Sequence, residues 1–278
     1  MALVKQWFSF YVLGNIHVGL AAYCLTKITL AEFAISNDAL ANFVFFATIL
    51  VYNFIRVVQL HNINSMTAIW IRSNKSALIL LNSVCLIFIV YYALSFSLSS
   101  LLILLPFLLA SIFYAVPISS NINGLRRIPG LKLFLISFTW AGVTLYFPLF
   151  AENLQGIEGI WISFFQRFLF IMAITIPFDI RDVQLDFPDL RTLPQVIGVG
   201  NSKAAAIMAI ILFELLEVYR STVYDATFMV SLVISLVSIL LILWAGVRQK
   251  RFYSSFWVES IPVFWYVLLL IFYNQSIF

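Results

Sequence analysis

The chain has 278 residues, of which 63% are hydrophobic and only 10% are charged, and its mean hydropathy is +1.03. A soluble domain is about half apolar and about a quarter charged, because polar groups must cover its surface. These values exclude a soluble globular protein. Apolar runs of about 20 residues also exclude a transmembrane barrel, whose strands are short and alternate in polarity. We therefore expect an all-α, polytopic membrane protein with no nucleic-acid partner.

Nine apolar segments are predicted to be transmembrane helices. They cover residues 8–30, 40–60, 77–96, 99–118, 131–151, 160–178, 204–219, 227–246 and 256–276. Short polar breaks such as Asn74–Lys75 and Gln155–Gly156 separate them, and no long linker or low-complexity tract divides the chain. We expect a single domain over residues 1–278. Because no small-residue cleavage site follows the first segment, we expect no removable signal peptide.

The placement of basic residues predicts the orientation of these spans. With the N-terminus in the cytoplasm, 13 of the 16 lysines and arginines fall in inner segments. These are Lys5, Arg56, Arg72, Lys75, Arg126, Arg127, Lys132, Arg181, Arg191, Lys203, Arg248, Lys250 and Arg251. An odd number of spans produces this split, in agreement with the positive-inside rule. We expect a cytoplasmic N-terminus, a C-terminus on the opposite side, and a location in the plasma membrane of a bacterium.

The inner connection after the sixth segment carries three aspartates at helical spacing. Asp179, Asp182 and Asp186 follow the pattern i, i+3, i+7, which places them within an arc of about 60° on one helix face. Like charges on one face repel, and carboxylate oxygens suit a hard cation such as Mg²⁺. The sequence therefore predicts a metal site at this position. The alternative is a solvated acidic helix end with Arg181 as ion-pair partner.

Two stretches of sequence resemble a known family. Residues 179–186, Asp-Ile-Arg-Asp-Val-Gln-Leu-Asp, followed by Thr192-Leu193-Pro194, resemble the second aspartate-rich motif of the UbiA family of intramembrane prenyltransferases. Residues 128–132, Ile-Pro-Gly-Leu-Lys, running into residues 140–142, resemble that family's connection between its fourth and fifth helices. The resemblance implies a nine-helix UbiA-like bundle in which Mg²⁺ binds an isoprenoid diphosphate. It also implies ionisation to an allylic carbocation, which an aromatic or other lipophilic acceptor captures.

The first aspartate motif of the family is degenerate in this chain. Asn53 matches, whereas Phe54, Val57 and His61 occupy the three aspartate positions. Seven residues from Ile55 match the seven from Ile180 at five positions, with a constant offset of 125. Four predicted spans separate the two copies, so we expect a parallel four-helix repeat with both copies on one side. One half of the site keeps its carboxylates, and the other has lost them.

Further polar residues complete the candidate site. Asp182, Asn53 and Tyr114 are the expected catalytic residues, the last because the resemblance implies a tyrosine near there. The expected substrate-binding residues are His61, Arg126, Arg127, Lys132 and His17. For the arginines and the lysine, plain positive-inside topology explains the charge equally well. For His17, the alternative is a core histidine bonded to a neighbouring helix.

The predicted function is that of a UbiA-type prenyltransferase. It would transfer an isoprenoid group from an allylic diphosphate to an aromatic or other lipophilic acceptor in the bilayer, with Mg²⁺ as cofactor if the protein is active. The alternative is a non-catalytic relative that binds an isoprenoid, another lipid or a membrane partner. The feature that separates the two is the first motif, because its loss removes the anionic ligands of a metal ion.

Two expectations concern residues inside the spans. Arg167 lies about seven residues from the outer end of the sixth span, and Glu214 about six from that of the seventh, so at about 1.5 Å per residue their depths nearly match. An unpaired charge at this depth is costly, so we expect Arg167 to pair with Glu214, or with Glu217 as second choice.

Cys24 and Cys85 are expected to be small buried side chains without a disulfide or metal role.

Overall fold

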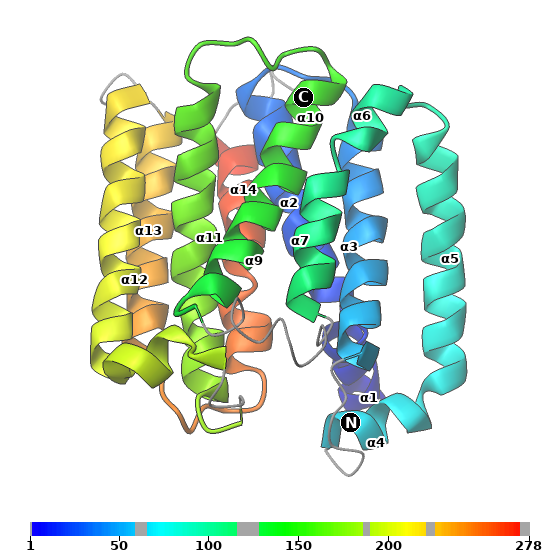
Figure 1. The fold of residues 1–278 in the computed structure, drawn as a ribbon, viewed down its shortest axis with the longest axis vertical. Helices are drawn as coiled ribbons and strands as arrows, with labels where there is room; N and C mark the ends of the chain where they lie inside the picture. Colours follow the sequence, from blue (N-terminus) through cyan, green and yellow to red (C-terminus); the bar gives the residue numbers. More distant parts are fainter. Residues whose placement is uncertain (1, 59–65, 116–127, 186–189, 221–225, 273–278) are drawn as a thin grey trace.

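The computed structural model describes residues 2–58, 66–115, 128–185, 190–220 and 226–272, and in these ranges every regular element is a helix (Figure 1). The elements are α1 (Ala2–Leu13), α2 (Ile16–Glu32), α3 (Asp38–Val58), α4 (Met66–Ser73), α5 (Lys75–Ala93), α6 (Leu98–Leu102), α7 (Leu105–Ala115), α9 (Leu131–Ala141), η2 (Gly142–Tyr146), α10 (Phe147–Ala151), α11 (Ile160–Asp182), α12 (Leu193–Arg220), α13 (Ala226–Trp244), η4 (Tyr253–Val258) and α14 (Ile261–Phe272).

Seven helical segments are long and apolar enough to cross a membrane. They are Asp38–Val58, Lys75–Ala93, Leu131–Ala151, Ile160–Asp182, Leu193–Arg220, Thr227–Trp244 and Tyr253–Phe272. Each corresponds to a predicted span, because uninterrupted apolar runs of this length form helices when water cannot satisfy the backbone. The chain is an integral, multi-pass membrane protein.

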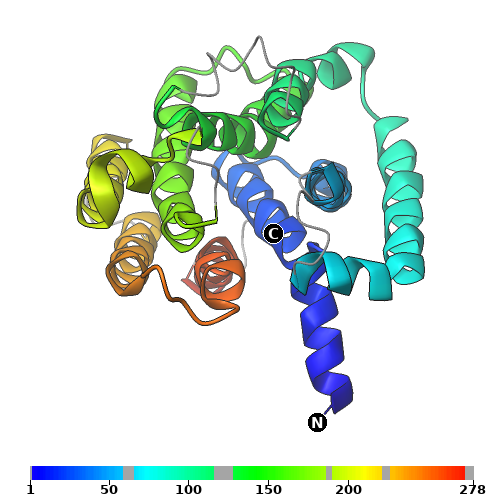
Figure 2. The same cartoon turned by 60° about the horizontal axis from the view of Figure 1, so that its bottom comes forward.

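Two predicted spans differ from the expectation of a single straight helix. The first is broken into α1 and α2, which meet at an angle of 55° (Figure 2). Asn15 adopts a left-handed conformation at the break, with φ of 61°, which ends α1 and turns the chain. The fourth span corresponds to the shorter apolar stretch Leu98–Phe113. The count of nine spans therefore stays a prediction.

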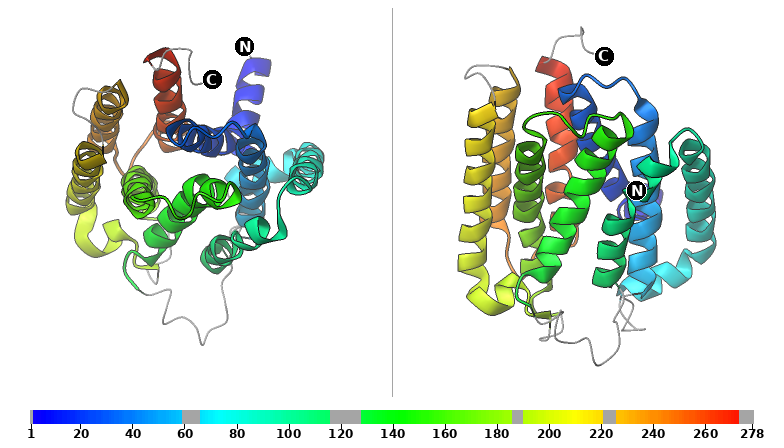
Figure 3. Two further views of the ribbon diagram at one scale, coloured as in Figure 1. Left: turned by 90° about the horizontal axis from the view of Figure 1, so that it is seen from above. Right: turned by 45° about the horizontal axis from the view of Figure 1, so that its top comes forward.

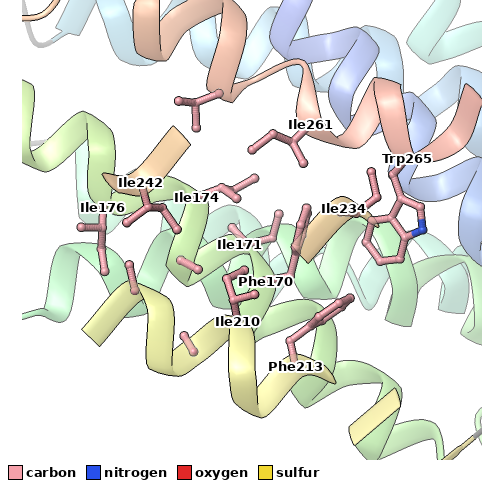
Figure 4. Close-up of a cluster of buried hydrophobic side chains, with 14 of the residues drawn as sticks. Phe170, Ile171, Ile174, Ile176, Ile210, Phe213, Ile234, Ile242, Ile261 and Trp265 are labelled. Carbon is pink, nitrogen blue, oxygen red and sulfur yellow. The ribbon is translucent and has the colours of Figure 1, made fainter. Parts of the chain in front are cut away.

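α11 is the most buried of the spanning segments. α9 and α12 pack directly against it, and its apolar side chains form one core cluster with those of α12, α13 and α14, including Phe170, Phe213, Ile234 and Trp265 (Figure 4). α5 lies at the opposite edge of the ring (Figure 3). Only 11% of its most apolar stretch is buried inside the protein, against 61% for that of α11. A helix that is apolar on all sides and mostly uncovered by protein faces lipid.

The predicted ion pair of Arg167 is wrong. Arg167 is buried, and its guanidinium donates to the Leu25 carbonyl at 2.9 Å and to two threonine hydroxyls. Glu214 accepts instead from two serines of α13, and Glu217 accepts from Gln166. Matching depths was insufficient because the direction in which each helix face points also decides which side chains meet. Cys24 and Cys85 are buried, as expected.

Candidate functional site

The second aspartate motif stands at the end of α11. The helix extends four residues beyond the predicted end of the span at residue 178, so Asp179 and Asp182 both lie in its last turn. Residues 183–185 then form a turn, and Asp186 lies outside the described residues. Two of the three aspartates, Asp179 and Asp182, therefore lie on one helix end as predicted.

Asp179 is the most buried charged group of this site. Its side chain is 1% exposed, and its Oδ1 lies 2.8 Å from the Nζ of Lys132. Lys132 is the second residue of α9, which begins after Gly130 in a left-handed conformation. A buried carboxylate requires a nearby cation to offset the loss of hydration. The predicted substrate-binding lysine therefore meets the predicted metal-binding aspartate.

Asp182 is held by its sequence neighbour. The Nε and Nη2 of Arg181 donate to its two carboxylate oxygens, each at 2.7 Å. The same guanidinium donates through Nη1 to Ser255 of η4 at 2.9 Å and lies over the ring of Phe178 at 5.3 Å. This bidentate arrangement is the strong form of a guanidinium–carboxylate pair. It is the ion pair that the alternative interpretation of the motif predicted.

Glu259 was not identified as a site residue from the sequence. It lies between η4 and α14, and the charges of both Arg56 and Arg181 act on it. Arg56 and Arg181 are equivalent residues of the sequence repeat, separated by the offset of 125. The ends of α3 and α11 are therefore brought to the same carboxylate. The signal that could have found it is an ionisable residue in an otherwise apolar span, which generally marks a paired or functional group.

Asn53 belongs to a buried amide network rather than to the aspartate cluster. Its Oδ1 accepts from Asn15 at 2.8 Å, and its Nδ2 donates to Asn82 at 2.8 Å and to the Gly14 carbonyl at 3.3 Å. These partners come from the break between α1 and α2 and from α5. The network satisfies backbone and side-chain groups at the helix break, where a buried polar group otherwise costs free energy. The described contacts of Asn53 do not include a group of α11.

His17 has the contacts of a core histidine. Its Nδ1 lies 2.7 Å from the hydroxyl of Tyr11, and its Nε2 lies 3.1 Å from both the Phe256 carbonyl and the Ser260 hydroxyl. Its ring also stacks on that of Phe256 at 4.8 Å. Both ring nitrogens thus have partners within the protein. This arrangement supports the alternative in which His17 joins α2 to the η4–α14 segment.

The first half-site is apolar where the second is acidic. Phe54 and Val57 are 53% and 57% exposed on α3. Phe54 lines a groove between α3 and α7 with a volume of about 340 Å³. The other residues of this groove are Leu50, Val51, Ile55, Leu108, Ser111 and Ile112. The described end of α3 therefore offers a metal ion no carboxylate, as the sequence predicted.

Several predicted site residues cannot be placed. His61, Arg126, Arg127 and Asp186 lie outside the described residues, and so does the side chain of Tyr114, whose backbone belongs to α7. Among the described residues, no three histidine, cysteine, aspartate or glutamate side chains are grouped closely enough to hold a metal ion. The predicted Mg²⁺ site of Asp179, Asp182 and Asp186 therefore stays a prediction.

Comparison with known proteins identifies the fold. A solved structure of a digeranylgeranylglyceryl phosphate synthase, a UbiA-type membrane prenyltransferase, is similar with a TM-score of 0.54. The similarity covers 98% of this chain and 99% of that one, at 17% sequence identity. The chain has the fold of a membrane prenyltransferase. No protein-family model and no curated protein sequence matches the chain. At this identity the likeness establishes the UbiA-like fold alone.

Proposed function

We propose that this chain acts as a UbiA-type prenyltransferase, with its donor site at the end of α11. It would bind the diphosphate of an isoprenoid donor there and pass the isoprenoid group to an aromatic or other lipophilic acceptor in the bilayer. The observation that carries this proposal is the pairing of Asp179 with Lys132 and of Asp182 with Arg181 at one end of a UbiA-like bundle. We further propose that this end faces the cytoplasm, where positive residues accumulate.

The two cations nearest the motif already have carboxylate partners. Lys132 pairs with Asp179, and Arg181 pairs with Asp182. A diphosphate would therefore meet cations that are already engaged. Binding of a polyanion requires either additional positive charge or release of these side chains from their carboxylates.

Asp179 and Asp182 would release these cations if they held Mg²⁺ instead. The carboxylate oxygens of Asp179 and Asp182 suit this hard ion, and we propose that they hold it together with Asp186. Lys132 and Arg181 would then be free to turn from the carboxylates to the phosphate oxygens. When bound, the ion would neutralise the charge that develops on the departing diphosphate. The two basic side chains orient the diphosphate and stabilise the same charge.

The test is the affinity for allylic isoprenoid diphosphates of several chain lengths, measured in nanodiscs with and without Mg²⁺. We expect wild-type protein to bind in the presence of the ion, and Asp182→Asn to lose about tenfold or more in affinity, since an amide keeps an oxygen but loses the charge. Asp38→Asn is the matched control. Asp38 also forms an ion pair with a lysine, Lys27, but at the beginning of α3, so its loss should leave binding unchanged.

Release of pyrophosphate in the presence of a lipophilic acceptor then tests turnover. Folded wild-type protein that binds no allylic diphosphate at any chain length would overturn the proposal. Binding without pyrophosphate release would instead identify the chain as a non-catalytic isoprenoid-binding relative. Persistence of Mg²⁺-dependent binding in Asp182→Asn would show that the ion is held elsewhere.

A further inference from the structure

A cavity with an apolar wall and several charged side chains lies at the end of the bundle opposite to Asp179. It occupies about 230 Å³ between the end of α2, the beginning of α11, the end of α12, the beginning of α13 and α14. Its polar lining includes Glu32, Gln166, Arg167, Glu217 and Arg220. The apolar part of the wall includes Phe213 and Trp265. The proposed prenyltransferase site does not use this cavity.

Arg167 is the deepest charged group of the cavity. It lies two turns into α11 and is 3% exposed, whereas Glu32 and Arg220 stand at the last residues of their helices. Its Nη1 donates to the Leu25 carbonyl and to the Thr144 hydroxyl at 3.2 Å, and its Nη2 donates to the Thr29 hydroxyl at 3.3 Å. Among the described residues, none of its hydrogen-bond partners is a carboxylate.

The neutral partners of Arg167 are fixed in their own bonds. The hydroxyl of Thr29 donates to the Leu25 and Thr144 carbonyls, and that of Thr144 donates to the Trp140 carbonyl at 2.7 Å. They therefore accept from the guanidinium but bring no negative charge. Of the five N–H donors of an arginine, three are used. The remaining two, on the adjacent Nε and Nη2, have no acceptor in the described part of the chain.

The two carboxylates of the cavity lie within a turn of the ends of α2 and α12 and are less buried than Arg167. Glu32 accepts from Nη2 of Arg220, and Glu217 accepts from Gln166 at 2.6 Å. Gln166 also accepts from Arg220 at 2.6 Å, so these four side chains form one connected network. The four charged groups of the cavity sum to zero. The guanidinium of Arg167 is thus more buried than the two carboxylates.

We propose that this cavity binds a small zwitterionic headgroup, with its oxyanion on Arg167 and its ammonium group toward Glu217 and Glu32. The two adjacent donors of Arg167 match a carboxylate or phosphate group that accepts from both. A net-neutral ligand matches the net-neutral lining. The volume lies below the roughly 300–1,000 Å³ of sites that enclose a whole small molecule, so the cavity holds the headgroup, and an attached acyl chain would lie outside it.

The ligand can be a lipid headgroup or its free counterpart, and the test distinguishes them. Purified protein in a non-ionic detergent is titrated with phosphatidylethanolamine, with phosphatidylglycerol and with soluble phosphoethanolamine, and complexes are counted by native mass spectrometry. We expect tighter binding of the ethanolamine lipid than of the anionic one. Binding of phosphoethanolamine with equal affinity would assign the site to a soluble ligand, whereas a strong preference for the lipid assigns it to the membrane.

Three variants test whether the headgroup binds in this cavity. Arg167→Gln should lower the affinity about 10- to 100-fold, the usual effect of losing a charge-assisted pair of hydrogen bonds. Ala31→Trp fills the cavity from a half-buried position and leaves Arg167 and its bonds in place, so it should abolish binding even if Arg167→Gln folds poorly. Arg251→Gln removes an exposed positive charge that does not line the cavity and should change nothing.

Unchanged binding in folded Ala31→Trp would overturn the proposal, as would a preference for the anionic lipid. Both outcomes are independent of the prenyltransferase proposal, because isoprenoid-diphosphate binding at the end of α11 is expected to survive in all three variants. The two sites can therefore fail separately.

Discussion

The ends of α3 and α11 carry related sequences but have different chemistry. Both helices end at the same side of the bundle (Figure 1), and Arg56 of one and Arg181 of the other act on the same carboxylate, Glu259. The end of α11 keeps two carboxylates, each in an ion pair. The corresponding positions at the end of α3 are Phe54 and Val57, which are more than half exposed.

This difference shows which part of the repeat is structural. Both copies have the arginine, and the charges of both arginines act on the shared Glu259. The aspartates are kept in one copy alone, where Lys132 and Arg181 stabilise them. At the other copy, Phe54 lines an apolar groove between α3 and α7. We infer that ion binding, if it occurs, rests on the α11 end.

The largest effect is expected at the buried pair of the α11 end. Lys132→Met removes the ammonium partner of Asp179, whose side chain is 1% exposed, and the loss of one partner of a buried pair costs about 3–5 kcal/mol. Thermal unfolding in detergent should show a strongly lowered Tm. At the α3 end, Phe54→Ala changes an exposed residue and should alter stability by no more than about 0.5 kcal/mol. Equal losses in the two variants would contradict the asymmetry.

A smaller loss is expected for the amide network of the first half. Asn53→Leu removes the partner of Asn15 and of Asn82, and each buried polar group left without a partner costs about 1–3 kcal/mol. The variant should unfold at a lower temperature but keep its affinity for an allylic diphosphate. A selective loss of that affinity in a protein of unchanged stability would instead show that Asn53 contacts the ligand.

A double-mutant cycle can measure how the two halves are joined. Glu259→Gln is combined with Arg56→Gln in one cycle and with Arg181→Gln in a second. Because both arginines act on Glu259, each cycle should give a coupling of about 0.5–1 kcal/mol in unfolding free energy. A coupling for one arginine and none for the other would mean that the repeat is not joined through this carboxylate.

Cysteine labelling tests whether the ends of α3 and α11 lie on the same side of the membrane. It does not depend on a change in stability. Single cysteines at Asn74 and Leu185 should react from the same side of the membrane, and one at Gln155, in the connection between α10 and α11, should react from the other. Cys24 and Cys85 are buried, so they contribute little background labelling. Reaction of Asn74 and Gln155 from one side would reject the predicted topology.

The sequence predicted the spans well because their length and apolarity are local properties. It did not predict the break at Asn15, since Gly14 and Asn15 lie within an otherwise apolar run. Nor did it predict the partners of Arg167, which depend on how α2, η2 and α11 are rotated against one another. Spacing correctly placed Asp179 and Asp182 on one helix end, but Lys132 and Glu259 join them only through tertiary packing.

The α11 end is proposed to bind a diphosphate through carboxylates that have no counterpart at the α3 end. Val57→Asp restores an acid at the position equivalent to Asp182, on an exposed part of α3. The measurement is the Mg²⁺-dependent affinity for an allylic isoprenoid diphosphate in wild type, Val57→Asp and Asp182→Asn. We expect opposite shifts of about tenfold each, with tighter binding by Val57→Asp and weaker binding by Asp182→Asn. Equal affinities in all three folded proteins would contradict this proposal.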